Sequence, residues 1–140
     1  MKLQLLTLLG TKLSEDVYEV QVPTATGPIA IFPHHQPLVT LLTTGVISVR
    51  RKKDDANADM EVFATYGGVA EITGDSVKIL VDEADHSDEI AEDIAIEALR
   101  KAEEMRENAK DSVELDKAQM MIDRYATRIK VAGLRRRNRR

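Results

Sequence analysis

The chain has 140 residues, of which 43% are hydrophobic and 4% aromatic, and its formal net charge is -4. That length accommodates one domain with an appendage, and no apolar run approaches the roughly 18 residues that a membrane-spanning helix needs. The absence of cysteine excludes disulfide scaffolds, thiolate catalysis and cysteine-bound zinc, and it fits a reducing, cytoplasmic environment.

Residues 1–84 show the alternation of apolar and polar side chains that is typical of half-buried strands. The opening segment 1–6 fits a first strand and not a signal peptide, because its apolar patch is very short. Turn residues separate the segments at Gly27-Pro28, Gly67-Gly68 and Gly74-Asp75. About eight strands in this length predict an antiparallel β-sandwich or barrel, in which each strand buries one face.

From Asp85 onward the period becomes helical. Ser87 is predicted to cap the first helix, and Asp111 with Glu114 is predicted to form a capping box that starts a second one. Residues spaced alternately by four and three positions form a first stripe, Ala91, Ala95, Ala98, Ala102, Met105 and Ala109, and a second, Ala118, Ile122, Tyr125, Ile129 and Ala132. Two such helices with a short connection either fold back as an antiparallel hairpin or straighten into one rod.

The predicted fold class is therefore α+β, with an antiparallel β-sandwich over residues 1–84 and a two-helix antiparallel hairpin over residues 85–140. Charge is sorted along the chain, with a balance of -4 in residues 1–84, -8 in residues 85–116 and +8 in residues 117–140. An alanine-lined seam gains little free energy per residue, and salt screens exposed charge pairs. These features predict a loosely docked, movable helix pair.

Three stretches resemble one protein family. Residues 24–45 read TATGPIAIFPHHQPLVTLLTTG, with a Gly turn, then Pro-x-His-x-Pro, then an apolar strand ending in Gly45. Residues 66–72 resemble the family's Gly-Gly hairpin, and residues 77–84 resemble its last sandwich strand. Over essentially its whole length the chain thus resembles the epsilon subunit of F-type, proton-translocating ATP synthases.

That resemblance implies a non-catalytic rotor subunit of the central stalk, which couples proton translocation to ATP synthesis. The sandwich would bind the γ subunit and the c-ring, and the helix pair would inhibit ATP hydrolysis by moving between a docked state and an extended state that reaches the catalytic α/β subunits. The chain would then lie peripherally at the cytoplasmic face of the cell membrane, associated with it only through the c-ring. The implied interface residues are Gly27, Ile29, Pro33, His35, Pro37, Leu38, Gly67 and Gly68.

The chain departs from the family pattern at two places. Gly27-Pro28-Ile29-Ala30 lacks the acidic residue that typically faces the c-ring. Residues 90–95, IAEDIA, lack the carboxylate and the arginine of an ATP-binding motif found in some members. Arg124 and Arg128 do match arginines that those members use for phosphate, so ATP binding by these two residues, in an ATP-sensing hairpin, is the alternative function.

The basic end of the chain allows three interpretations: an acidic protein partner, a solvated tail, or a nucleic-acid contact. Guanidinium groups suit carboxylates, whereas the missing aromatic residues disfavour nucleic acid. Regulatory contacts are predicted for Arg124, Arg128, Lys130, Arg135, Arg136 and Arg137. His34 and His35 point to opposite faces if they lie on a strand, so no metal site is expected. No nucleophile or phosphate-loop pattern predicts an enzyme.

Overall fold

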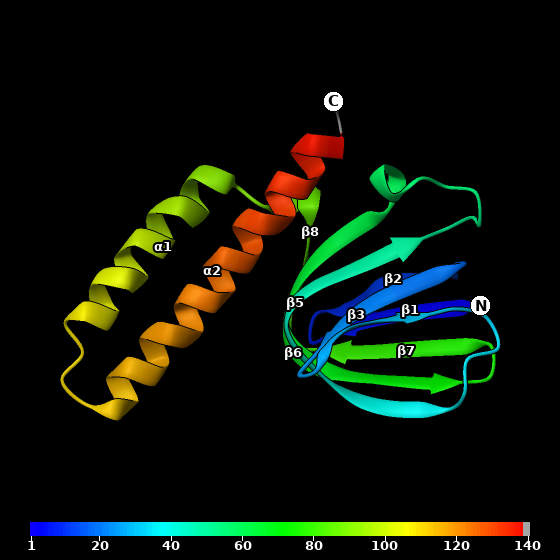
Figure 1. Cartoon of the computed structure of the whole chain (residues 1–140), viewed down its shortest axis with the longest axis horizontal. Helices are drawn as coiled ribbons and strands as arrows, with labels where there is room; N and C mark the ends of the chain where they lie inside the picture. The colour runs from blue at the N-terminus through cyan, green and yellow to red at the C-terminus, as the bar shows by residue number, and fades with distance from the viewer. Residues whose placement is uncertain (139–140) are drawn as a thin grey trace.

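The computed structural model describes the backbone of residues 1–138 and the side chains of residues 1–135 (Figure 1). The sandwich contains β1 (Lys2–Thr7), β2 (Gly10–Asp16), β3 (Glu19–Thr24), β4 (Gly27–Ile31), β5 (Leu38–Arg50), β6 (Glu61–Thr73), β7 (Ser76–Val81) and β8 (Ala84–His86). Two short 3₁₀ helices, η1 (Asn57–Asp59) and η2 (Ser87–Glu89), precede β6 and follow β8. The helix pair consists of α1 (Glu92–Glu107) and α2 (Ser112–Asn138).

One continuous sheet of order β2-β1-β7-β6-β5-β3-β4 folds over to make both layers, and β8 pairs with β6 off this path. The long strands β5 and β6 take part in both layers. Residues 68–73 of β6 pair with β7, whereas residues 63–65 pair with β8. The two strands bend between these regions, at the side of the sandwich that faces the helices (Figure 1).

Apolar side chains from both layers form the core between them. Leu3 and Leu5 of β1 lie beside Val77 and Ile79 of β7 in register. The opposite layer contributes aliphatic residues from β3, β4 and β5, together with Phe63. The core members are Leu3, Leu5, Val17, Val20, Val22, Ile31, Leu42, Ile47, Val49, Phe63, Ala70, Ile72, Val77, Ile79, Val81 and Ala84. The period-two pattern of the sequence is thus the pattern of side chains that face this core.

The sandwich differs from the prediction in two details. Its strand pairs are antiparallel except that β1 pairs with β7 in parallel. The expected boundary between residues 84 and 85 falls inside β8, where Ala64 is opposite Asp85 and Phe63 is opposite His86. The sheet therefore extends two residues into the segment that the sequence assigns to the helical part.

The two helices form an antiparallel hairpin and not a rod (Figure 1). The predicted cap at Ser87 is wrong: Ser87 is buried in η2, and α1 begins at Glu92 after Ala91, which gives no side-chain cap. The predicted cap of the second helix is confirmed in part. Asp111 Oδ1 accepts the Glu114 amide at 2.8 Å, but Glu114 Oε2 accepts the amide of Lys110 and not that of Asp111. Neither helix has the length and apolar character needed to cross a membrane.

Candidate functional site: the docking face of the second helix

α2, and not α1, lies next to the sandwich (Figure 1). The side of α2 that contacts the sandwich is a heptad stripe offset by one residue from the predicted one. We call this stripe the docking face; it consists of Lys117, Met121, Arg124, Arg128, Val131 and Arg135. Val131 is fully buried and, with Ala132, packs against Val62 and Ala64 of β6 and Ile90. Alternate residues of β6 thus face the core on one side and α2 on the other.

The predicted alanine stripes account for the hairpin seam. Ala95 and Ala102 of α1 and Ala118 of α2 are buried, which fits the close helix approach that small side chains permit. Arg106 Nη1 contacts Gln119 Oε1 across the hairpin at 3.4 Å. Among the described side chains, Arg124, Arg128 and Arg135 of α2 pair with carboxylates in residues 83–88, the segment that links the sandwich to α1. In these contacts the basic charge of α2 is therefore directed to that segment.

At the centre of the docking face, Tyr66 of β6 lies among Arg124 and Arg128 of α2 and the carboxylates of Glu83 and Asp85. Arg124 Nη2 lies 2.5 Å from Glu83 Oε2, and its guanidinium carbon lies 4.1 Å from the centre of the Tyr66 ring. The Tyr66 hydroxyl donates to Asp85 Oδ2 at 2.5 Å, and Arg128 Nη1 lies 3.3 Å from the same oxygen. Two cations, one ring and two carboxylates therefore bind α2 to the sandwich.

This environment shifts two pKa values. Burial and the adjacent Asp85 carboxylate raise the pKa of Tyr66 well above its ordinary value, so the hydroxyl keeps its proton and remains a donor. Burial alone would lower the pKa of Arg124, but the Glu83 carboxylate outweighs burial and the pKa is raised. The contacts are nevertheless partly exposed, and such ion pairs contribute about 0.2–1 kcal/mol each. The docking is therefore specific in geometry and modest in free energy.

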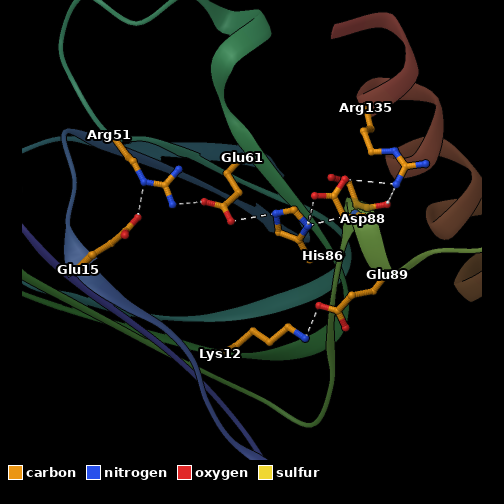
Figure 2. Close-up of polar contacts among 9 residues, drawn as sticks. Lys12, Glu15, Arg51, Glu61, His86, Asp88, Glu89 and Arg135 are labelled. Carbon is orange, nitrogen blue, oxygen red and sulfur yellow. Dashed lines mark hydrogen bonds and ion pairs between the residues drawn. The ribbon is translucent and has the colours of Figure 1, made fainter. Parts of the chain in front are cut away.

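Further along α2, Arg135 binds η2. Arg135 Nη1 donates to the Ser87 carbonyl oxygen at 3.1 Å and lies 3.3 Å from Asp88 Oδ1. Figure 2 shows that a chain of polar contacts continues from this point through His86 and Glu61 to Arg51 and Glu15. Lys12 of β2 binds Glu89 in the same region at 2.5 Å. Among the described residues, no group of three or more His, Asp or Glu side chains is placed to hold a metal ion.

Of the predicted regulatory residues, Arg124, Arg128 and Arg135 lie on the docking face, whereas Lys130 is exposed on α2. The side chains of Arg136 and Arg137 lie outside the described residues. Arg124 and Arg128 each already have a carboxylate partner, which a phosphate group would have to displace. ATP binding by this pair stays a prediction.

The predicted interface residues do not form one site. Gly27 follows the β3–β4 turn, and Ile29 packs against the sandwich core. The loop with Pro33, His35 and Pro37, which leads into β5 at Leu38, lies near the β6–β7 turn, because Nδ1 of the neighbouring His34 is 3.6 Å from Asp75 Oδ1. Within this loop the His35 ring nitrogen Nδ1 donates to the Gln36 carbonyl oxygen at 2.7 Å. Gly67 and Gly68 lie at the other end of β7, where Gly68 is opposite Val81.

An exposed apolar surface on the outer side of the β1–β7 layer was missed by the sequence analysis. Register places Leu41 beside Val69, Val69 beside Leu80, and Leu80 beside Leu6, so the four form a row across β5, β6, β7 and β1. Leu41 is 74% exposed. The row, which we call the apolar face, continues to Leu8 at the β1–β2 turn, and such surfaces mark contacts with other proteins. Each strand shows an apolar residue at an outward position in the sequence, but only the strand register shows that these residues lie side by side.

Comparison with known proteins gives a family. Residues 1–87 match the ATP synthase, Delta/Epsilon chain, beta-sandwich domain family. The chain is 33% identical over 135 residues to the ATP synthase epsilon chain of Herpetosiphon aurantiacus, covering 96% of each chain. It is 36% identical over 122 residues to that of Trichodesmium erythraeum, covering 85% of each chain.

Solved structures share the fold. A chain of the Euglena gracilis mitochondrial ATP synthase superposes with a TM-score of 0.80 at 20% identity, covering 93% of this chain and 79% of that one. A chain of the Tetrahymena thermophila mitochondrial ATP synthase central stalk and c-ring gives 0.61 at 13% identity, covering 92% and 96%. The sandwich and the helix pair both fall within the shared architecture.

Proposed function

Because this chain belongs to the ATP synthase delta/epsilon chain family, we propose that its helix pair regulates ATP hydrolysis by leaving the sandwich. Membership makes the chain a non-catalytic rotor subunit of the central stalk of F-type ATP synthase.

The sandwich is the rotor-binding part in this proposal. The apolar face offers a γ subunit a row of exposed aliphatic side chains, of which Leu41 and Leu80 are 74% and 46% exposed. The loops at the sandwich ends, with Gly27 and the Pro33–Pro37 segment, are assigned to the c-ring. The chain then lies at the cytoplasmic face of the membrane and reaches it only through that ring.

The docking face carries the regulatory proposal. Its arginines are held by Glu83, Asp85 and Asp88 in partly exposed pairs. Acidic segments on the catalytic subunits would compete for the same guanidinium groups. A swing of the helix pair from 1:99 to 99:1 requires about 5.5 kcal/mol of differential binding. Several hydrogen bonds to charged groups, at about 1.5–3 kcal/mol each, reach that value.

The test removes the competing carboxylates while keeping the shape of the segment. In the assembled synthase, the double variant Glu83→Gln, Asp85→Asn should weaken docking, favour the extended state and lower ATP hydrolysis severalfold. The control is Glu97→Gln with Glu104→Gln, because both residues pair only with Arg100 of their own helix in the contacts observed. Unchanged hydrolysis in the first variant, with the enzyme fully assembled, would contradict the regulatory role.

A further inference from the structure

His86 lies where the sandwich, η2 and the end of α2 meet. Its ring is half-buried and packs edge-on against Phe63, with centroids 5.1 Å apart. Nε2 is 2.9 Å from Glu61 Oε1, and Nδ1 is 3.0 Å from the backbone nitrogen of Asp88 (Figure 2). Because the Asp88 N–H donates to Nδ1, that nitrogen carries a lone pair, and the ring proton is assigned to Nε2. The observed contacts thus require the neutral ring.

The turn that His86 caps is the turn that Arg135 holds. His86 accepts from the Asp88 amide of η2, and Arg135 binds the Ser87 carbonyl and the Asp88 carboxylate of the same turn. No other docking-face arginine binds η2 in the contacts described. A rearrangement of η2 therefore changes the contacts of Arg135, which attach the C-terminal part of α2 to η2.

We propose that protonation of His86 releases the C-terminal half of α2 from the sandwich. This inference rests on the proposed mobility of the helix pair. A proton on Nδ1 removes the lone pair that accepts the Asp88 amide, so the cap of η2 is lost. The new N–H then turns to Asp88 Oδ2, which lies 3.6 Å from Nδ1, and competes with Arg135 for that carboxylate.

The charges around the ring fix the direction of the effect. Glu61 from β6 and Asp88 from η2 attract a cationic ring, whereas Arg135 from α2 and Arg51, which follows β5 and binds Glu61, repel it. Glu89 of η2 is already bound by Lys12 of β2. Release of α2 removes Arg135 but leaves Glu61 in place, so the released state binds the proton more readily. By linkage, acid favours release.

The relevant pH range separates His86 from the carboxylates. Histidine is the side chain that ordinarily changes charge between pH 5 and 8, whereas Asp and Glu ordinarily titrate near pH 4. The range from pH 8 to about pH 5.5 therefore tests a histidine and not a carboxylate. A mildly acidic compartment would therefore shift the docking equilibrium without unfolding the sandwich.

The experiment measures docking directly in the isolated chain. The chain has no cysteine, so Lys53→Cys with Ala126→Cys, both exposed in the native chain, provide the only two sites for a fluorescent or spin-label pair. In the labelled parent, the ratio of released to docked molecules should rise about fivefold from pH 8 to pH 5.5, the effect of one net hydrogen bond. His86→Asn should abolish the rise, because its amide oxygen can still cap η2 but takes up no proton.

Two controls make the result decisive. His34→Asn, in the loop near the β6–β7 turn, should leave the pH response as in the parent, and circular dichroism checks that each variant is folded. A pH response retained in His86→Asn would overturn the proposal. The proposal would also be overturned if the parent showed no pH response although the variant Glu83→Gln, Asp85→Asn releases α2 at pH 8. If that carboxylate variant fails to release α2 as well, the proposed mobility of the helix pair is itself contradicted.

Discussion

Glu19 and Arg50 show how one buried pair can organise a loop. Arg50 Nε lies 2.7 Å from Glu19 Oε2, and Glu19 is only 5% exposed. The same guanidinium donates to the Asp55 carbonyl oxygen and to Asn57 Oδ1. One side chain of β5 therefore ties β3 to the loop that leads into β6.

This pair predicts a pH dependence of stability. Burial by itself would raise the pKa of Glu19, but hydrogen bonds from Arg50 and Gln21 outweigh burial and hold it below its ordinary value. A lowered pKa contributes stability that is present above the ordinary glutamate pKa and lost as the pH falls through the lowered value. Glu19→Gln should therefore cost about 3 kcal/mol at pH 7, because it leaves Arg50 without its countercharge, and this cost should shrink below about pH 4.

Urea denaturation between pH 3 and pH 7 measures this effect. Glu97→Gln is the matched control, since Glu97 also binds an arginine but does so on the exposed surface of α1. It should leave the free energy of unfolding unchanged within error. A loss at pH 7 that is equal in the two variants would contradict the assignment of Glu19 to a buried structural pair.

Among the secondary-structure elements, β6 is the one on which the sandwich depends most. Its bend brings Gly68 against β7, and a Cβ on Gly68 would lie 2.3 Å from the Leu80 carbonyl oxygen, with φ at +153°. Gly74, in the β6–β7 turn, also has positive φ, but nothing lies within 4 Å of its added Cβ. Substitution at Gly74 therefore tests the effect of positive φ alone, whereas substitution at Gly68 tests positive φ together with a steric clash.

Gly68→Ala should lower the free energy of unfolding by about 2–4 kcal/mol, since backbone strain and a steric clash act together. Gly74→Ala should cost about 1 kcal/mol, from conformation alone. Thermal denaturation of both variants checks the difference. Equal losses of unfolding free energy in the two variants would contradict the view that Gly68 is needed because β6 and β7 approach closely there.

The elements also show where sequence reasoning stops. Alternation along β1, β3 and β7 predicts their core faces, since a side chain's face follows from its own strand. It does not reveal the parallel pairing of β1 with β7, which depends on the order of strands in space. The sequence singles out Arg124 but not the docking face to which it belongs or the buried Val131, because a mixed charged and apolar heptad does not stand out beside the alanine stripe. The prediction of Ser87 as a helix cap is wrong because Ser87 begins the separate short helix η2, which ends three residues before α1 begins at Glu92.

At the scale of the whole molecule, the sandwich has a larger buried core than the contact between α2 and the sandwich. Among the residues whose side chains the structure describes, sixteen pack in the sandwich core, whereas the buried cluster between α2 and the sandwich has five: Val62, Ala64, Ile90, Val131 and Ala132. Partly exposed ion pairs and the contact of Arg124 with the Tyr66 ring add to this attachment. Fewer buried side chains hold α2 in place than hold the sandwich together, which is what the proposed regulatory motion requires.

The label pair at Lys53→Cys and Ala126→Cys, placed in the assembled synthase, tests that motion most directly. Distances recorded while the enzyme makes ATP and while it hydrolyses ATP should reveal two populations, one docked and one extended. The extended population should grow under the conditions in which hydrolysis is suppressed. A single docked distance under every supply of nucleotide and proton gradient would contradict the account.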